Sequence, residues 1–200
     1  MADPYAPHNA RQVLRLIDEY PLAWIVSAAS GSFAAAPLPL LAETDTEGEI
    51  NAFFGHIPLH HVLTPKLQEA PRALVLFNGP QGYVSPEWVS RAQWAPSWNF
   101  AVAHFEVDVE FVPTQTVESL ERLITKMEAS RLNPWSLSRL GSRYEGLVSR
   151  IVAFRAHVRS SRARFKLGQD ETVETRAELL SALPDGPLRS WMRGVNASAG

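Results

Sequence analysis

The composition of this 200-residue chain already excludes several classes of protein. It contains no cysteine, which rules out disulfide bonds, cysteine-ligated zinc, iron–sulfur clusters and thiol nucleophiles. Its 19 Lys and Arg nearly balance its 21 Asp and Glu, and the net charge of −2 does not suggest a dedicated binder of nucleic acid or of membrane surfaces. With 46% hydrophobic residues, the chain can bury the core of one domain of ordinary size.

The two ends of the chain suggest how it is organised. We expect a single domain over residues 1–200, with a helical C-terminal appendage at about residues 170–193. The opening MADPYAPHN has an acid and two prolines where a secretory signal needs a basic start and an apolar run. No stretch approaches the roughly 20 apolar residues that would span a bilayer. We therefore expect a cytoplasmic protein without a membrane partner.

Hydrophobic spacing and turn-forming residues predict a mixed order of helices and strands. In chain order, the predicted elements are a helix over 9–20, strands over 22–29, 33–42 and 50–57, a helix restarting at Thr64-Pro65, a strand over 72–77, a turn over 78–82, a strand over 97–112, helices around 117–127 and 137–147, a strand over 150–159, and helices over 172–183 and around 188–192. About six strands that do not strictly alternate with helices argue against a doubly wound parallel sheet. An antiparallel barrel with helices packed outside fits the pattern better.

Two of the predicted strands carry a particularly clear signal. Pro37 and Pro39 lie two apart and remove backbone donors from the same edge of their strand, so that edge cannot carry a hydrogen-bonded ladder. In the strand over 97–112, apolar residues from Ala101 to Phe111 alternate with His104, Glu106, Asp108 and Glu110. We expect one face of that strand to lie in the core and the other to face water.

An aromatic cluster precedes and opens the same strand. Trp88, Trp94 and Trp98 lie close together in sequence with Tyr83 and Phe100. Aromatic faces joined to a few polar groups can sandwich a flat heterocycle, because stacking and apolar burial act together. The alternative is that the cluster belongs to the core or to a dimer interface.

A basic stretch occupies the C-terminal third of the chain. No acidic residue lies between Gly146 and Gly168, whereas six basic residues do. They are Arg150, Arg155, Arg159, Arg162, Arg164 and Lys166. At strand spacing the last three would point the same way and form a row able to hold a phosphate. A solvated face, a face paired with Glu106, Asp108 and Glu110, and nucleic-acid binding remain alternatives.

Motifs for other chemistry are weak. His56, His60 and His61 lie near one another, but Pro58 interrupts them and no carboxylate lies nearby in sequence, so we expect no metal site. The chain has no Gly-x-Ser-x-Gly elbow, GxGxxG motif or Walker loop. The sequence therefore identifies no catalytic residue, and the catalytic residues stay unknown.

Several segments together resemble the PaiB family of FMN-binding negative transcriptional regulators, which have the split-barrel fold of pyridoxamine-phosphate-oxidase-like proteins. The matching segments are PYAPHN near the start, LPLL at 38–41, GH at 55–56, FNGPQGYVSPEWV at 77–89, PSWNFAVAHFEV at 96–107, IVAFRAHV at 151–158 and ARFKLGQD at 163–170. They occur in the same order and cover most of the chain. The resemblance implies a mainly β, α+β fold: a split antiparallel β-barrel with peripheral helices.

The resemblance also implies a cofactor and its ligands. It predicts a homodimer with FMN at the subunit interface. The expected cofactor-binding residues are His56, Ser97, Trp98, Asn99, Lys166 and Gln169. Lys166 can meet a phosphate, Asn99 and Gln169 can pair with flavin edge atoms, and Trp98 can cover a ring.

The implied function is that of an FMN-binding protein of the PaiB type, either a flavin-dependent or a flavin-responsive transcriptional regulator. DNA is a partner that the net charge does not support. A small flavin oxidoreductase is one alternative, with the redox chemistry residing in the cofactor. The other is a dimeric interaction module that has lost flavin binding, because Gly168 and Asp170 stand where many relatives read KLSQN.

Overall fold

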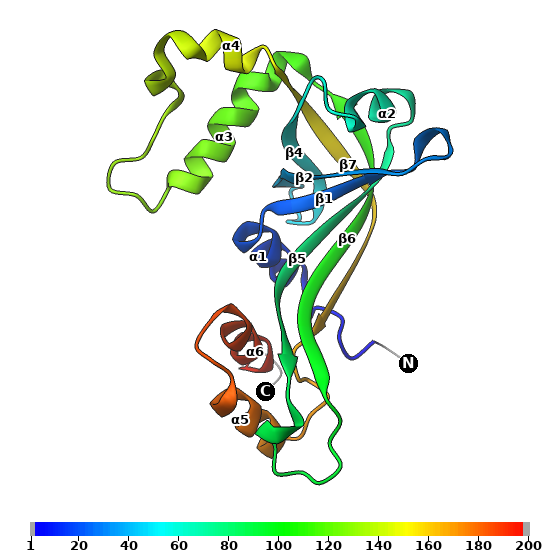
Figure 1. The fold of residues 1–200 in the computed structure, drawn as a ribbon, viewed down its shortest axis with the longest axis vertical. Coiled ribbons are helices and arrows are strands. Elements are labelled where there is room, and N and C mark those ends of the chain that lie inside the picture. The colour runs from blue at the N-terminus through cyan, green and yellow to red at the C-terminus, as the bar shows by residue number, and fades with distance from the viewer. Residues whose placement is uncertain (1–2, 198–200) are drawn as a thin grey trace. The chain divides into compact units, whose positions relative to one another are not determined.

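The computed structural model describes residues 3–197 of the chain, which form strands and helices that are interspersed along the sequence (Figure 1). The strands are β1 Leu22–Ser27, β2 Ala34–Pro39, β3 Leu41–Thr44, β4 Ile50–Pro58, β5 Arg72–Val84, β6 Ser97–Phe111 and β7 Ile151–Lys166. The α-helices are α1 Ala10–Glu19, α2 Leu63–Glu69, α3 Thr116–Glu128, α4 Tyr144–Val148, α5 Val173–Ala182 and α6 Pro187–Ala197. The strands form one sheet in the order β2-β1-β5-β6-β7-β4-β3.

The chain divides into two compact units, each made of segments that are distant in sequence. The central unit comprises Ile17–Phe77 and His104–Arg162, and the terminal unit comprises Met1–Leu16, Asn78–Ala103 and Ala163–Gly200. Strands β5, β6 and β7 contribute residues to both units. The expectation that the whole chain acts as one domain stays a prediction.

Aromatic packing and antiparallel pairing build the central unit. β1 pairs with β2 and β5, and β4 pairs with β3 and β7, all antiparallel. The fully buried rings of Phe53, Phe77 and Phe105 meet with centroids 4.8–6.0 Å apart. Such contacts combine large apolar burial with favourable ring geometry, so this cluster anchors the core of the unit.

The prolines of β2 lie as their spacing predicted. Pro37 is opposite Trp24 and Pro39 is opposite Leu22 on β1, and β2 is the last strand on its side of the sheet. A proline fits a strand only where its missing N–H is not needed for the ladder. The prediction of an edge without a ladder is therefore confirmed.

The alternation predicted for β6 is also confirmed. Ala101, Ala103, Phe105, Val107 and Val109 are all buried, and the residues between them are partly or fully exposed; Phe111, at the end of the strand, is only partly buried.

The turn predicted at residues 78–82 is wrong, because β5 continues through them to Val84. Pairing with β1 ends at Phe77, so Pro80 lies where β5 no longer has β1 beside it and its missing N–H is tolerated. Gly79 serves close packing: a Cβ there would lie 2.2 Å from Leu16 Cδ1. Glycine and proline are common in turns, but here Gly79 permits close packing and Pro80 lies where no N–H is needed by β1.

Two further predictions need adjustment. β7 does not stop near residue 159 but continues to Lys166. The helix predicted around 137–147 is a 3-10 stretch, Leu137–Arg143, followed by α4, with Gly141 at φ 54° between regular turns. Within residues 3–197, no helix combines the length and apolarity needed to cross a membrane.

Candidate functional site

Three strand segments in the terminal unit present one buried and one exposed face. On the buried face lie Val84 of β5, Asn99 of β6 and Phe165 of β7. Side chains alternate along a strand, so the neighbours of these residues point the other way. Tyr83 and Trp98 fall at such positions, and both are about half exposed. Part of the aromatic cluster predicted from the sequence thus lies on one exposed face, which we call the outer face of the terminal unit.

An aromatic hollow occupies part of this outer face. The side chain of Trp98 is half-exposed, its Nε1 donates to Gln81 Oε1 at 3.0 Å, and its ring centroid lies 6.1 Å from that of Tyr83. A cavity of about 340 Å³ is lined by Asn78, Gly79, Gln81, Trp98, Phe100, Ala101 and Val102. An exposed indole fixed by a hydrogen bond beside such a hollow can cover one side of a flat ligand.

A cation and a hydroxyl meet where β6 begins and β7 ends. Lys166 Nζ donates to Ser97 Oγ at 2.6 Å, and both side chains are partly exposed. An ammonium group has three N–H donors, of which this bond uses one, and the hydroxyl has a donor of its own. The pair can therefore present several donors to an anion such as a phosphate.

The other basic residues of β7 are mostly committed to partners. Arg155 donates to Glu43, and Arg159 to Asp108, in the central unit. In the terminal unit, Arg164 lies 4.8 Å over the ring of Tyr5 and 4.0 Å from the carboxylate of Asp3. The alternative of a face paired with Glu106, Asp108 and Glu110 thus holds for Arg159, whereas Lys166 meets a hydroxyl.

Asn99 and Gln169 use their side chains inside the terminal unit. Asn99 is 3% exposed, and its Nδ2 lies 3.5 Å from the sulfur of Met192 on α6. The side-chain oxygen of Gln169 accepts from the Leu167 N–H at 2.7 Å, and its nitrogen donates to the Phe165 carbonyl. Their predicted pairing with flavin atoms stays a prediction, and in this arrangement neither amide is offered to the outer face.

His56 lies on β4 in the central unit, where its neighbours fix its protonation state. Its Nδ1 is 3.3 Å from Ser119 Oγ, and that hydroxyl donates its proton to the Thr116 carbonyl at 2.8 Å. The Ser119 oxygen must therefore accept from His56, which places the imidazole proton on Nδ1. Burial lowers the pKa of His56, so the ring is neutral near pH 7. Its Nε2 then has a free lone pair as an acceptor.

The remaining histidines of this region show no metal-like arrangement. His61 Nδ1 accepts from the Leu63 N–H at 3.2 Å, a local contact within the loop before α2. Among residues 3–197, no three His, Asp or Glu side chains come together as a metal ion would require.

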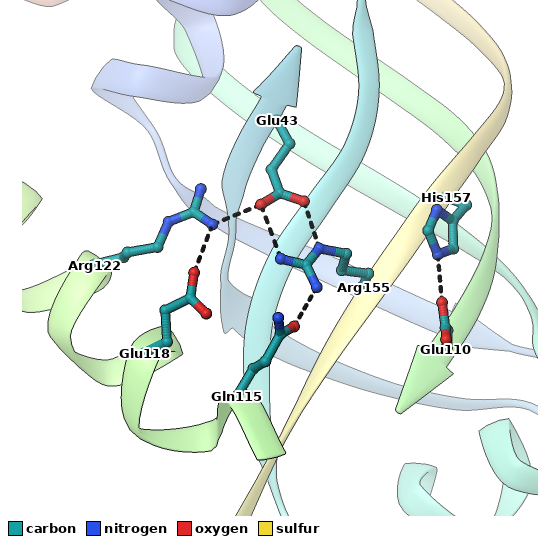
Figure 2. Close-up of polar contacts among 7 residues, drawn as sticks. All are labelled: Glu43, Glu110, Gln115, Glu118, Arg122, Arg155 and His157. Carbon is teal, nitrogen blue, oxygen red and sulfur yellow. Dashed lines mark hydrogen bonds and ion pairs between the residues drawn. The ribbon is translucent and has the colours of Figure 1, made fainter. Parts of the chain in front are cut away.

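A network of charged residues that the sequence did not reveal lies in the central unit. Figure 2 shows the carboxylate of Glu43 between Arg122, at 2.6 Å, and Arg155, at 2.8 Å. Both guanidinium groups also lie over the ring of Phe54, at 4.8 and 4.6 Å from its centroid. Burial alone would raise the pKa of Glu43, but the hydrogen bonds from Arg155 and Arg122 outweigh it and lower the pKa.

This network has a structural role that follows from its members. Glu43 lies on β3, Arg122 on α3 and Arg155 on β7, so the three side chains tie a helix to two strands. Gln115 and Glu118 complete it by contacting Arg155 and Arg122. Glu43 falls between the strands predicted over 33–42 and 50–57, and no local pattern indicates partners 79 and 112 residues away.

Comparison with known proteins gives matches over most of the chain. A family model described as "Putative FMN-binding domain" matches residues 1–160. The Bacillus subtilis (strain 168) protein named "Protease synthase and sporulation protein PAI 2" is 27% identical over 165 residues, which make up 81% of this chain and 78% of that protein.

Solved structures give the same fold at lower identity. The FAD and heme binding protein from Mycobacterium smegmatis matches with a TM-score of 0.58 and 15% identity, over 89% of this chain and 80% of that one. A 5-nitroimidazole antibiotic resistance protein from Bacteroides thetaiotaomicron VPI-5482, named as putative, matches with a TM-score of 0.57 and 12% identity, over 79% and 84%. At such identities the likeness concerns the fold alone. The predicted α+β, mainly β split barrel with peripheral helices is confirmed.

Proposed function

Because the chain belongs to the family described as "Putative FMN-binding domain", we propose that it binds FMN in its terminal unit, where β6 begins and β7 ends. Family membership also confirms the resemblance to the PaiB proteins on which this expectation first rested. The observation that carries the proposal is the contact of Lys166 Nζ with Ser97 Oγ, close in sequence to the half-exposed indole of Trp98.

The donors present fit the chemistry of a flavin mononucleotide in part. Lys166 and Ser97 supply a charge and a hydroxyl for the terminal phosphate, and charge-assisted bonds of this kind are the stronger ones. Trp98 and the hollow beside it supply an apolar surface for a flat ring. A bound flavin would supply hydride or one-electron transfer, while these residues would hold and orient it.

A second candidate function is favoured by the two amides that face inward. Asn99 and Gln169 are engaged with Met192 and with the backbone of Phe165 and Leu167. A site without their donors would hold flavin weakly, because unmet polar edges of a ligand reduce affinity. The alternative is therefore a dimeric interaction module that has lost flavin binding.

The assembly, role and location of the protein are part of the same proposal. We propose a cytoplasmic homodimer that responds to flavin as a transcriptional regulator, with a small flavin oxidoreductase as the alternative. The regulatory form is what the resemblance to the PaiB family implies, and the relative in question is named "Protease synthase and sporulation protein PAI 2". Binding to an upstream DNA fragment that falls steeply with rising salt would support direct contact with DNA. Binding that is absent, or that salt leaves unchanged, would contradict it.

Absorption spectroscopy and FMN titration test the central claim. Freshly purified protein should show flavin absorption, or the apoprotein should gain thermal stability with excess FMN. Lys166→Met should weaken FMN binding by about tenfold to a hundredfold, because a hydrogen bond to a charged group is worth about 1.5–3 kcal/mol. Arg139→Met is the matched control: it removes the same charge from an exposed residue of the central unit and should leave affinity unchanged.

The two candidate functions give opposite results in this titration. Colourless protein whose thermal midpoint does not move with FMN would contradict flavin binding and favour the interaction module. An FMN-binding protein in which Lys166→Met behaves like Arg139→Met would contradict the assignment of Lys166 to the phosphate.

A further inference from the structure

The segment around Tyr5 is attached to the strand that carries Lys166. The carbonyl of Tyr5 accepts from the Phe165 N–H at 2.7 Å, which adds one backbone bond next to Lys166. The side chain of Phe165 is fully buried and packs edge-on against Trp191, with ring centroids 5.6 Å apart. The residue that precedes Lys166 is thus held on its backbone by Tyr5 and on its side chain by α6.

The phenol of Tyr5 reaches past Lys166 to the far side of the following turn. Its hydroxyl donates to the Asp170 carboxylate at 2.6 Å. Between these attachment points, Gly168 adopts φ +84° and Gln169 folds back onto the Phe165 carbonyl and the Leu167 N–H. Tyr5 therefore spans the turn from residue 165 to residue 170, with Lys166 between its two attachments.

The same segment occupies the neighbouring cation. Arg164 lies 4.8 Å over the Tyr5 ring and 4.0 Å from the carboxylate of Asp3, whose Oδ1 also accepts from the Tyr5 N–H at 3.0 Å. A guanidinium held over an aromatic ring and beside a carboxylate is less available to an external anion. Lys166, whose ammonium meets Ser97, is left as the cation that can serve a ligand there.

We propose that Tyr5 is a positioning residue for Lys166: it fixes the 165–170 turn and diverts Arg164, so that the Lys166 ammonium is preorganised for a phosphate-bearing ligand. This inference rests on the proposed FMN binding. Preorganisation raises affinity because less conformational freedom is lost when the ligand binds. Arg164 and Asp170 act only through their contacts with Tyr5.

A double-mutant cycle in FMN affinity tests this role. Tyr5→Phe keeps the ring under Arg164 and removes the bond to Asp170, and it should weaken FMN binding about threefold to tenfold, the range expected for one hydrogen bond. In a Lys166→Met background, Tyr5→Phe should change the affinity no further, because it acts through Lys166. Tyr144→Phe, in the central unit, is the matched control and should behave as wild type.

A second readout does not depend on flavin. Inorganic phosphate, measured by its competition with FMN and by its shift of the thermal midpoint, should bind more weakly to Tyr5→Phe than to wild type. If Tyr5→Phe does not fold, Asp170→Ala removes the same hydrogen bond from its other end.

The outcomes separate this inference from the function on which it rests. If wild type binds FMN and Lys166→Met weakens it, but Tyr5→Phe equals wild type, the role of Tyr5 is wrong and the proposed function stands. If Tyr5→Phe weakens binding equally with and without Lys166, Tyr5 is a structural tether and the inference is again wrong. If wild type binds neither FMN nor phosphate, the proposed function fails and the inference fails with it.

Discussion

Replacing Gly79 by alanine should destabilise the protein, because β5 passes too close to α1 at this point for a side chain. A Cβ at residue 79 would lie 2.2 Å from Leu16 Cδ1 and 3.0 Å from the Ala101 carbonyl oxygen. Leu16 is fully buried, and a backbone oxygen within a strand can move little, so the clash is not easily relieved. Overpacking of this kind costs about 1–3 kcal/mol, and we expect a value near 2 kcal/mol.

Thermal and denaturant unfolding would measure this effect. For a protein of this size, 2 kcal/mol corresponds to a fall of about 4–8 °C in Tm. Gly146→Ala is the control: a Cβ at residue 146 would have no atom within 4 Å, and in helix α4 the change should stabilise by up to about 1 kcal/mol.

A cycle with Leu16 identifies the cause. Leu16→Ala alone should cost about 2–5 kcal/mol, as for other buried leucines. In the Gly79→Ala background it should cost about 1–2 kcal/mol less, because the clashing methyl group is gone. Strictly additive effects, or a Gly79→Ala variant as stable as wild type, would refute the close packing of β5 on α1.

Other changes test the remaining contacts. Glu43→Gln should cost about 2 kcal/mol near neutral pH, a value between those of exposed and fully buried ion pairs. The pKa of Glu43 in the folded protein is lowered from its ordinary 4.5, so this stabilisation is present above pH 4.5 and is lost as the pH falls through the folded pKa. A difference in unfolding free energy between wild type and variant that persists in acid would contradict this. The hydrogen bond to Asp170, followed by burial, raises the pKa of Tyr5 to about 12. Ultraviolet titrations of wild type and Tyr5→Phe should therefore coincide near pH 10 and differ by one ionised phenol only at higher pH. A Tyr5 phenol that ionises near pH 10 would be evidence against that bond. Met192→Leu keeps the packing but removes the sulfur acceptor of Asn99, and should lower stability by about 1 kcal/mol in urea unfolding, whereas an unchanged midpoint would show that the contact contributes nothing.

Much of the fold follows from local pattern. The alternation in β6 and the spacing of Pro37 and Pro39 are properties of neighbouring residues, and both predicted the structure. The segment 78–82 failed because glycine and proline are also used for close approach and at unpaired edges. The end of β7 was missed because its Arg- and Ser-rich sequence lacks the apolar alternation that marks a half-buried strand.

The candidate site, too, could be predicted from the sequence only in part. The exposed position of Trp98 could be derived from period two alone. The inward position of Asn99 depends on Met192, 93 residues later, and the bond from Tyr5 to Asp170 joins residues 165 apart. Contacts of that kind are set by tertiary packing, and no local sequence pattern reports them.

The two prolines of β2 have a consequence for the behaviour of the protein at high concentration. An open strand edge can template the addition of a strand from another molecule, which is the first step of ordered aggregation. Pro37 and Pro39 remove backbone N–H donors at alternate positions of β2, the strand at the edge of the sheet. Replacing both with valine would restore a continuous template, and we expect the variant to form thioflavin-positive fibrils under conditions in which the parent stays clear.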